Sequence, residues 1–237
     1  MTEVLFQELR PGADGRLQQV QRELVQHFGQ PPAREVRDPL SQLIYSMLAV
    51  RTPTEVSEQV LRELRARYTT WDELRDAPLG EIERALEAVT FAEQKALHLK
   101  ATLEQITARV GRLTLDFLAQ YRTEKIRSWL QQFPGVGPQV SAAVVNFSTL
   151  RRRAISVDAH HLRVTQRLGL TPRADAATTE ERLMRLVPPE WTAEQLDEHH
   201  QLVKRLGQTI CVFENPRCRV CPLAGLCPTA ARQRTQT

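Results

Sequence analysis

Aromatic side chains, lysines and long apolar runs are all scarce in this chain of 237 residues. Only 5% of the residues are aromatic, and the alternating β-branched runs typical of strands are missing, whereas Leu, Ala, Arg, Glu and Gln recur throughout. No apolar run approaches the roughly 20 residues of a membrane-spanning helix. Residues 1–10 show neither a basic region nor a small-residue cleavage site, so we expect no export signal and no membrane partner. These absences favour an all-α protein of the cytoplasm.

Lysine is rare although basic residues are not. Of the 32 basic residues only four are lysines, so chemistry that requires an amine has few candidates: Lys95, Lys100, Lys125 and Lys204. The net charge of +4 does not by itself indicate a nucleic-acid partner. Basic side chains gather at 151–153 and from residue 201 onward, where six of them accompany a single acidic residue. Each cluster is compatible with an ordinary solvated face.

The four cysteines fall within seventeen residues, in the pattern Cys211-x6-Cys218-x2-Cys221-x5-Cys227. In a chain without an export signal, a reducing cytosol would keep them as thiols, which argues against a disulfide framework. Four thiolates at such spacing are typical of a metal centre. The residues alone leave a tetrahedral zinc site and an iron–sulfur cluster both open.

Apolar periodicity predicts one helix after another. Residues 16–28 form an amphipathic pattern closed by Gly29, and Asp38-Pro39 is typical of an N-cap and first helical residue before the apolar run 40–50. Further helices are predicted at 54–67, 79–88, 92–109, 114–120, 123–132, 138–149, 159–168, 178–187 and 194–210. The polar end, 229–237, is predicted to fray.

Two of these helices are joined by Pro134-Gly135-Val136-Gly137. Glycines at both ends of the turn permit left-handed dihedrals, and the turn places bare backbone N–H groups at the start of a helix that begins with Pro138. Such donors at a positive helix end suit a phosphate, but the same residues also make a plain helix–turn–helix corner. The motif alone does not separate these two interpretations.

Asp158 lies at the head of another predicted helix, about twenty residues further on. An aspartate in this place most often serves as an N-cap that satisfies free backbone donors. The same donors also hold the carboxylate ionised and oriented, as a catalytic base or a cation stabiliser requires. Taken alone, Asp158 is better explained as a cap.

Taken together, the hairpin, Asp158 and the four-cysteine segment have the order and spacing of the helix-hairpin-helix DNA glycosylases, and the chain resembles the endonuclease III branch over about 15–227. The resemblance implies that Cys211, Cys218, Cys221 and Cys227 hold a [4Fe-4S] cluster. It also implies a helical hairpin domain at 40–151 and a second helical domain formed by 1–39 and 152–237. Double-stranded DNA containing a lesion is the implied partner, bound in a cleft between the domains with the target nucleotide flipped. We expect a monomer, associated with the nucleoid in a bacterial cytoplasm.

The resemblance further implies DNA contacts. The hairpin residues Gly135, Val136 and Gly137 correspond to the part that grips a phosphate, and Arg217 and Arg219 lie beside the cluster ligands. The residue that fills the space of the flipped base aligns at Phe91 or its neighbours, although Phe91 is equally explained as an apolar residue that begins the next helix.

Two departures from the family limit what it implies. The segment facing the orphaned base usually reads Ser-x-Gln-x-Thr-Asp, whereas residues 50–55 read Val-Arg-Thr-Pro-Thr-Glu, so contacts by Arg51 and Thr52 are altered and base preference with them. Bifunctional members have a lysine two residues after the second hairpin glycine, where this chain has Gln139. A lysine amine can attack C1′ and form a Schiff base, but an amide cannot, because its nitrogen lone pair is delocalised.

The sequence therefore predicts a glycosylase that removes a damaged base, by default an oxidised pyrimidine, or a mismatched one, with Asp158 as the acidic residue and AP lyase activity weak or absent. Gln139 is expected to donate a hydrogen bond to the attacking water or to the base. An adenine glycosylase fits less well, because the position expected to hold a carboxylate is Leu48. The alternative from another class is a DNA-damage binding protein with weak or no catalysis.

Overall fold

The computed structural model describes residues 15–234, and every regular element in that range is a helix. Its only strand-like pairing there is an isolated bridge between Arg37 and Ser148, so the expected all-α fold is confirmed. No helix in this part of the chain has the length and apolar character needed to cross a membrane. Residues 1–10, for which we expected no export signal, lie outside the described range.

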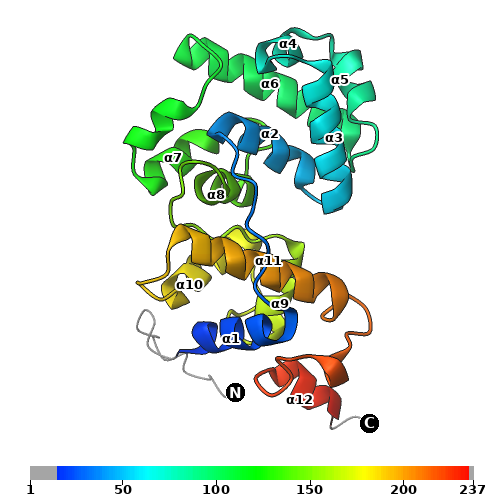
Figure 1. The fold of residues 1–237 in the computed structure, drawn as a ribbon, viewed down its shortest axis with the longest axis vertical. Coiled ribbons are helices and arrows are strands. Elements are labelled where there is room, and N and C mark those ends of the chain that lie inside the picture. The colour runs from blue at the N-terminus through cyan, green and yellow to red at the C-terminus, as the bar shows by residue number, and fades with distance from the viewer. Residues whose placement is uncertain (1–14, 235–237) are drawn as a thin grey trace, which may run out of the picture. The chain divides into compact units, whose positions relative to one another are not determined.

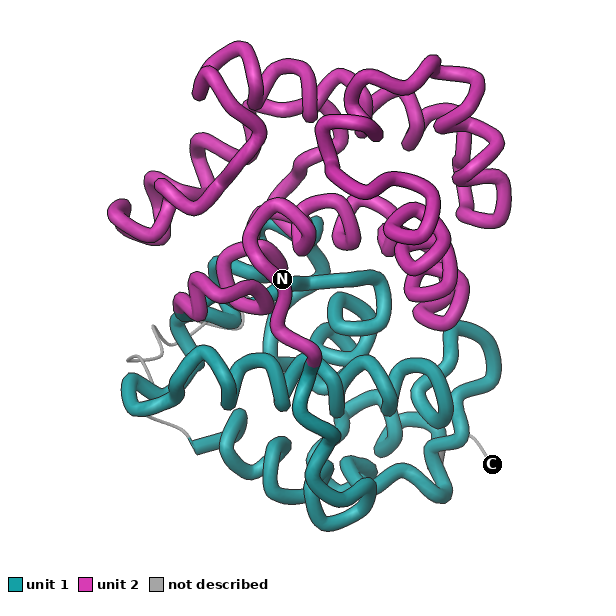
Figure 2. The backbone as a smooth tube through the Cα atoms, turned by 45° about the horizontal axis from the view of Figure 1, so that its top comes forward, with its two compact units in different colours: residues 1–34, 153–237 teal, residues 35–152 magenta. Residues whose placement is uncertain are grey.

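The chain divides into two compact units, one formed by residues 35–152 and the other by the segments on either side of it, up to residue 34 and from residue 153 (Figure 2). The unit formed by 35–152 contains α2 (Pro39–Ala49), α3 (Thr54–Arg67), α4 (Trp71–Asp76), α5 (Leu79–Ala85), α6 (Ala92–Val110), the 3-10 turn η1 (Asp116–Gln120), α7 (Thr123–Leu130) and α8 (Pro138–Phe147). The other unit contains α1 (Arg16–Phe28), α9 (Ala159–Arg167), α10 (Ala176–Leu186), α11 (Ala193–Thr209), the 3-10 turn η2 (Cys218–Val220) and α12 (Pro228–Arg234).

The unit formed by 35–152 is built around α2 and α8, which pack against each other and are buried along most of their length (Figure 1). α2 begins as expected: the side chain of Asp38 accepts a hydrogen bond from the backbone N–H of Ser41 at 2.9 Å, and Pro39 occupies the first turn. α6 packs against α2, α4 and α5. α2 and α8 therefore form the centre of this unit's core.

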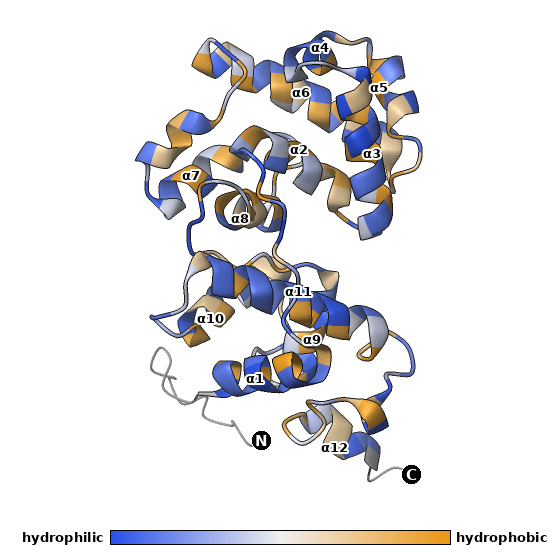
Figure 3. Cartoon of the chain, viewed as in Figure 1, coloured by the Kyte–Doolittle hydropathy of each residue, from blue (hydrophilic) through white to orange (hydrophobic). Residues whose placement is uncertain are grey.

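The other unit has its own apolar core beneath α11, which packs against α9 and α1. α1 is amphipathic, and its apolar residues Leu17, Val20 and Leu24 are buried. α11 begins with a capping box, in which Thr192 and Gln195 each bind the other's backbone N–H. The amphipathic helices show hydrophobic and hydrophilic residues on different sides (Figure 3).

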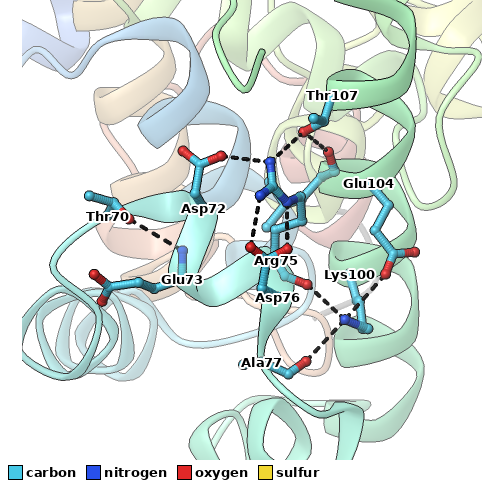
Figure 4. A network of polar contacts seen from close by, with 10 residues as sticks. Thr70, Asp72, Glu73, Arg75, Asp76, Ala77, Lys100, Glu104 and Thr107 are labelled. Atoms are coloured by element: carbon cyan, nitrogen blue, oxygen red, sulfur yellow. Dashed lines mark hydrogen bonds and ion pairs between the residues drawn. The ribbon is translucent and has the colours of Figure 1, made fainter. Parts of the chain in front are cut away.

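The structure corrects three local expectations. The predicted helix at 114–120 is a 3-10 turn, Asp116–Gln120. α4 was not predicted: it is only six residues long, and Arg75 and Lys100 fix its end through a polar network (Figure 4). Residues 228–234 form α12 instead of fraying, because Thr229 donates to the carbonyl of Arg167 at 2.9 Å. Residues 235–237 lie outside the described range.

Candidate functional site

The hairpin between α7 and α8 is a tight turn tied to the core of its unit. The backbone N–H of Val136 donates to the carbonyl of Phe133 at 3.1 Å, and the hydroxyl of Thr102 donates to the carbonyl of Pro134 at 3.0 Å. The side chain of Val136 is 5% exposed. Val136 is thus a core residue whose backbone N–H is already bonded within the turn. This N–H is therefore a poor candidate for binding a phosphate.

The two hairpin glycines have different conformations. Gly135 has φ +74°, in the left-handed region, and a Cβ there would approach the side chain of His98 to about 3 Å. Gly137 is extended, with φ −91°, so only Gly135 uses the left-handed region that the sequence permits at both glycines. Within the described part of the chain the amides of Gly135 and Gly137 donate to no backbone carbonyl, and they remain the candidate phosphate donors.

Gln139 lies in the first turn of α8, directly after Pro138, and is partly exposed. α8 begins at the hairpin with Pro138. The first N–H groups of a helix have no acceptor within it, so the missing N–H of proline costs nothing there, and the φ of proline already suits a helix. The structure therefore places an amide, and no amine, at the start of this helix.

Arg51, Thr52 and Phe91 are brought together at the C-terminal end of α2 and the N-terminal end of α6. The Arg51 guanidinium carbon lies 6.0 Å from the centroid of the Phe91 ring, and both side chains are exposed. Phe91 is the N-cap residue of α6, so it does begin the helix, and its 55% exposure leaves the ring accessible to a partner. Thr52 is 8% exposed and its hydroxyl is bound to Lys95, so a direct DNA contact by Thr52 does not fit.

Lys95 is a residue of this site that sequence reasoning missed. It is buried, and its ammonium donates to the carbonyls of Leu48 and Val50 and to the Thr52 hydroxyl. Burial lowers the pKa of Lys95 to about 8. Apolar periodicity could not find it, because lysines on helices are usually solvated.

Asp158 is the N-cap of α9, as predicted. Its side chain accepts a hydrogen bond from the backbone N–H of His161 at 2.7 Å, and its carbonyl accepts from Leu162 at 2.8 Å. Burial opposes ionisation, but His200 and the His161 backbone N–H outweigh it, so the pKa of Asp158 lies below its usual value. The carboxylate is therefore charged at neutral pH.

Three buried histidines on α9 and α11 form a cluster that sequence reasoning missed, and two of them, His161 and His200, interact electrostatically with Asp158. The ring of His161 stacks on His200 at 5.7 Å between centroids and meets His199 edge-on at 5.5 Å. Burial lowers the pKa values of His161 and His199 to about 3 and that of His200 to about 4. All three rings are therefore neutral at pH 7. At that pH the capping N–H and Lys204 keep the Asp158 carboxyl ionised.

The four cysteine side chains line a single pocket between α9, α11 and the C-terminal segment. The four are not joined in disulfides and have intermediate exposure: Cys211, Cys218, Cys221 and Cys227. Burial raises the pKa of the Cys221 thiol to about 11. Among residues 15–234, no group of three or more His, Cys, Asp or Glu side chains is arranged to hold a single metal ion.

Two arginines of α9 hold this segment in place, and sequence reasoning missed them. Arg163 donates from Nε to the carbonyl of Cys211 at 2.9 Å. Arg167, one turn later, donates to the carbonyls of Val212 and Phe213 at 2.6 and 2.7 Å. An arginine pair spaced i, i+4 on a helix looks like a solvated face in a sequence, so nothing marked this role.

Arg217 and Arg219 are both exposed beside the cysteine pocket, where a phosphate could reach them. The other basic cluster, 151–153, is used within the fold. Arg152 donates to the carbonyl of Ala119 and Arg153 to that of Pro188, each at 2.9 Å.

Comparison with known proteins points to DNA repair. A family described as "HhH-GPD superfamily base excision DNA repair protein" matches residues 44–189. Endonuclease III of Synechocystis sp. is 27% identical over 197 residues, 83% of this chain and 84% of the relative. Endonuclease III of Thermotoga maritima is 27% identical over 212 residues, 89% and 92% respectively. With a longer Arabidopsis thaliana relative, 30% identical over 152 residues, the match spans 64% of this chain and about half of that protein, 52%.

Solved structures share the fold. A non-covalent complex of endonuclease III with DNA superposes with a TM-score of 0.75 at 23% identity, covering 94% of this chain and 98% of that one. A thermostable thymine-DNA glycosylase superposes with a TM-score of 0.71 at 20% identity, covering 93% and 99%.

Proposed function

Because the chain belongs to the HhH-GPD superfamily of base excision DNA repair proteins, we propose that it is a DNA glycosylase acting on lesion-containing double-stranded DNA. The proposed reaction is hydrolysis of the bond between a damaged or mismatched base and its sugar. The endonuclease III relatives support this class of reaction. An oxidised pyrimidine is the default substrate. Because residues 50–55 differ from the family pattern that faces the orphaned base, other lesions are also to be tested.

The observation that supports catalysis is the ionised carboxylate of Asp158 at the head of α9. As the bond from C1′ to the base breaks, the electron pair leaves with the base and positive charge develops on the sugar. A fixed carboxylate stabilises that charge, and it also orients and deprotonates the water that adds to C1′. Both roles require Asp158 to be ionised before the substrate arrives, and the capping N–H of His161 favours that state.

Gln139 supports a one-step reaction that leaves an intact abasic strand. Its amide nitrogen has no free electron pair for attack on C1′, so no imine forms and no strand cleavage follows. The amide is able to donate a hydrogen bond to the attacking water or to the base. We therefore propose a monofunctional enzyme with AP lyase activity weak or absent.

The four cysteines fit a [4Fe-4S] cluster. All four residues line one pocket, and four thiolates are the usual ligand set of such a cluster. When bound, the cluster supplies four iron–thiolate bonds that tie 211–227 into one loop.

A panel of duplexes tests the function. Each duplex contains one lesion, among them thymine glycol, 8-oxoguanine, uracil and a G·T mismatch, with an undamaged duplex as the control. Released base is measured by chromatography, and abasic sites are revealed by alkali. We expect release from at least one lesion and no strand break before alkali. Tight lesion binding without release from any duplex would instead favour the DNA-damage binding protein.

A further inference from the structure

Lys95 joins two chain segments that lie far apart in the sequence. Its ammonium donates to the carbonyl of Leu48 at 2.6 Å, to the carbonyl of Val50 at 2.7 Å and to the Thr52 hydroxyl at 2.8 Å. The same hydroxyl accepts a hydrogen bond from the backbone N–H of Thr90 at 3.2 Å. Lys95 and Thr52 thus connect the C-terminal end of α2 to the segment that precedes α6.

The residues beside this connection have strained backbones. Arg51 has φ +56° and Phe91 has φ +60°, both in the left-handed region that non-glycine residues rarely adopt. Such a conformation is energetically unfavourable for a non-glycine residue and persists only when the surrounding contacts fix it. Arg51 follows Val50, whose carbonyl Lys95 binds, and Phe91 follows Thr90, whose amide Thr52 binds. The contacts that fix both strained residues therefore meet at Lys95.

The strain produces an exposed pair with a defined geometry. The guanidinium of Arg51 lies 6.0 Å from the centroid of the Phe91 ring, and the ring is 55% exposed. A ring with an adjacent cation has the chemistry to stack on an unpaired base and to approach a phosphate. A phenylalanine that served only to pack the core would be buried, whereas the Phe91 ring is exposed.

The positive charge of Lys95 lies where the end of α2 stabilises it. The carbonyls at the C-terminal end of a helix attract a cation, and α2 ends at Ala49. Burial lowers the pKa of Lys95 only to about 8, so the ammonium is charged at pH 7 and all three of its protons have acceptors.

We propose that Lys95 is a positioning residue for lesion recognition, which holds Arg51 and Phe91 as one rigid pair that contacts the DNA where a nucleotide is missing from the stack. The proposal rests on the proposed function, because it requires lesion-containing DNA as the partner. Lys95 itself, being buried, contacts no DNA.

Lys100 offers a matched control on the same helix. Its ammonium donates to the carbonyls of Arg75 and Ala77 at 2.7 and 3.0 Å, at the C-terminal end of α4 (Figure 4). Unlike Lys95, Lys100 also forms an ion pair with Glu104. Removing either amine leaves two helix-end carbonyls without their donor, but only Lys95 adjoins the Arg51–Phe91 pair. Lys100→Met therefore reports the loss of an equivalent structural contact.

The test measures binding of the full chain to two duplexes, one intact and one with a tetrahydrofuran abasic analogue. We expect Lys95→Met to lower the ratio of the two affinities by about tenfold, as when a base–aromatic stack is lost, and Lys100→Met to leave it unchanged. In an Arg51→Ala, Phe91→Ala background, Lys95→Met should lower the ratio no further, because the pair it positions is gone.

Thr52→Val keeps the size of the side chain and both carbonyl contacts of Lys95, but removes the hydroxyl that accepts from Lys95 and from the backbone N–H of Thr90. It should lower the ratio in the same direction, and it decides the question if Lys95→Met does not fold. An unchanged ratio in the folded Lys95 or Thr52 variants would overturn the proposal, even while base release by the wild-type protein continues. Absence of both release and lesion preference in the wild type would instead contradict the proposed function.

Discussion

The carboxylate of Asp158 and the backbone N–H of His161 lie 2.7 Å apart, so a single hydrogen bond both caps α9 and favours the ionised form of the acid. The two consequences are separable by chemistry. An asparagine caps a helix about as well as an aspartate, but it has no charge. The structural and catalytic roles of Asp158 can therefore be tested with one substitution.

We expect Asp158→Asn to fold normally and to lose base excision. The free energy of unfolding should change by less than about 1 kcal/mol, because the capping oxygen remains. The rate of base release should fall by about a hundredfold or more, because charge stabilisation at the sugar is lost, while affinity for a lesion duplex persists. Chemical denaturation and single-turnover excision measure the two effects.

Asp175→Asn is the matched control for this prediction. Asp175 caps α10 in the same way, accepting from the backbone N–H of Thr178 at 2.8 Å. Its replacement should leave excision unchanged. If Asp158→Asn also turned over at the wild-type rate, Asp158 would be a helix cap and nothing more.

The buried histidines predict that the fold is sensitive to acid. The pKa values of His161, His199 and His200 lie near 3, 3 and 4 in the folded protein, against about 6.5 in an unfolded chain. Below pH 6.5 the unfolded chain takes up protons that the folded protein does not. As the pH is lowered from 6.5 to about 4, the free energy of unfolding should therefore decrease, by up to about 1.4 kcal/mol per pH unit for each histidine. Urea denaturation between pH 7.5 and 5 measures this slope.

His161→Leu should make the slope shallower by up to about 1.4 kcal/mol per pH unit, since one strongly shifted group is removed. It should also stabilise the protein at pH 7.5, because within the described structure both ring nitrogens of His161 are buried without a hydrogen-bond partner. His27→Gln, at an exposed histidine, serves as the control and should leave the slope as it is. A slope unaffected by His161→Leu would mean that the cluster does not govern the acid response.

Local patterns in the sequence were sufficient for most of the helices. Capping signals placed α2 and α9 correctly because Asp38 and Asp158 act through bonds within three residues of themselves. α4 and α12 were missed since each is short and depends on partners far along the chain, such as Thr107 bound by Arg75 and the Arg167 carbonyl bound by Thr229.

The candidate site shows the same limit. The N-cap Asp158 could be predicted, and the cysteines could be proposed as ligands, because an N-cap and a ligand spacing are patterns in sequence. Lys95 was not found, since its role depends on acceptors at Leu48 and Val50, more than forty residues away. The sequence also could not show that Thr52 faces inward while Arg51 next to it faces outward, because the positive φ of Arg51 follows no periodic pattern.

The cysteine pocket predicts a coloured protein. Purified without oxygen, the chain should absorb broadly near roughly 400 nm and contain about four irons, as expected for a [4Fe-4S] cluster. Cys221→Ser should lose most of this absorption and destabilise the unit that contains α9 and α11, because the segment after Cys211 would be held mainly by Arg163 and Arg167. A colourless protein that binds one zinc ion would contradict the assignment.

Arg217 and Arg219 are predicted to contact phosphates. Replacing either by Ala should weaken DNA binding to a similar degree for intact and damaged duplexes, and should reduce the slope of log affinity against log salt by about one. Arg185→Ala is the control, because Arg185 is exposed in the same unit but pairs with Glu181. Unchanged slopes in both Arg217 and Arg219 variants would make them ordinary surface residues.

The last prediction concerns Gln139 and the absence of an amine at the start of α8. Imine formation requires an amine within about 3–3.5 Å of C1′. The wild-type protein should therefore give no covalent complex with an abasic duplex on borohydride reduction, and Gln139→Lys should give one. The measurement is a denaturing gel of the reduced mixture, with strand cleavage scored before and after alkali.

The remaining lysines define the outcome that would contradict this reasoning. Lys95 and Lys100 are bound to carbonyls inside their unit, and Lys125 lies 4.1 Å from the ring centroid of Tyr121. Lys204 differs: it lies on α11 one turn after His200 and contributes to lowering the pKa of Asp158, so its amine is near the acid. Efficient trapping by the wild type that disappears in Lys204→Met would show that the amine has moved to α11 and that the enzyme is bifunctional.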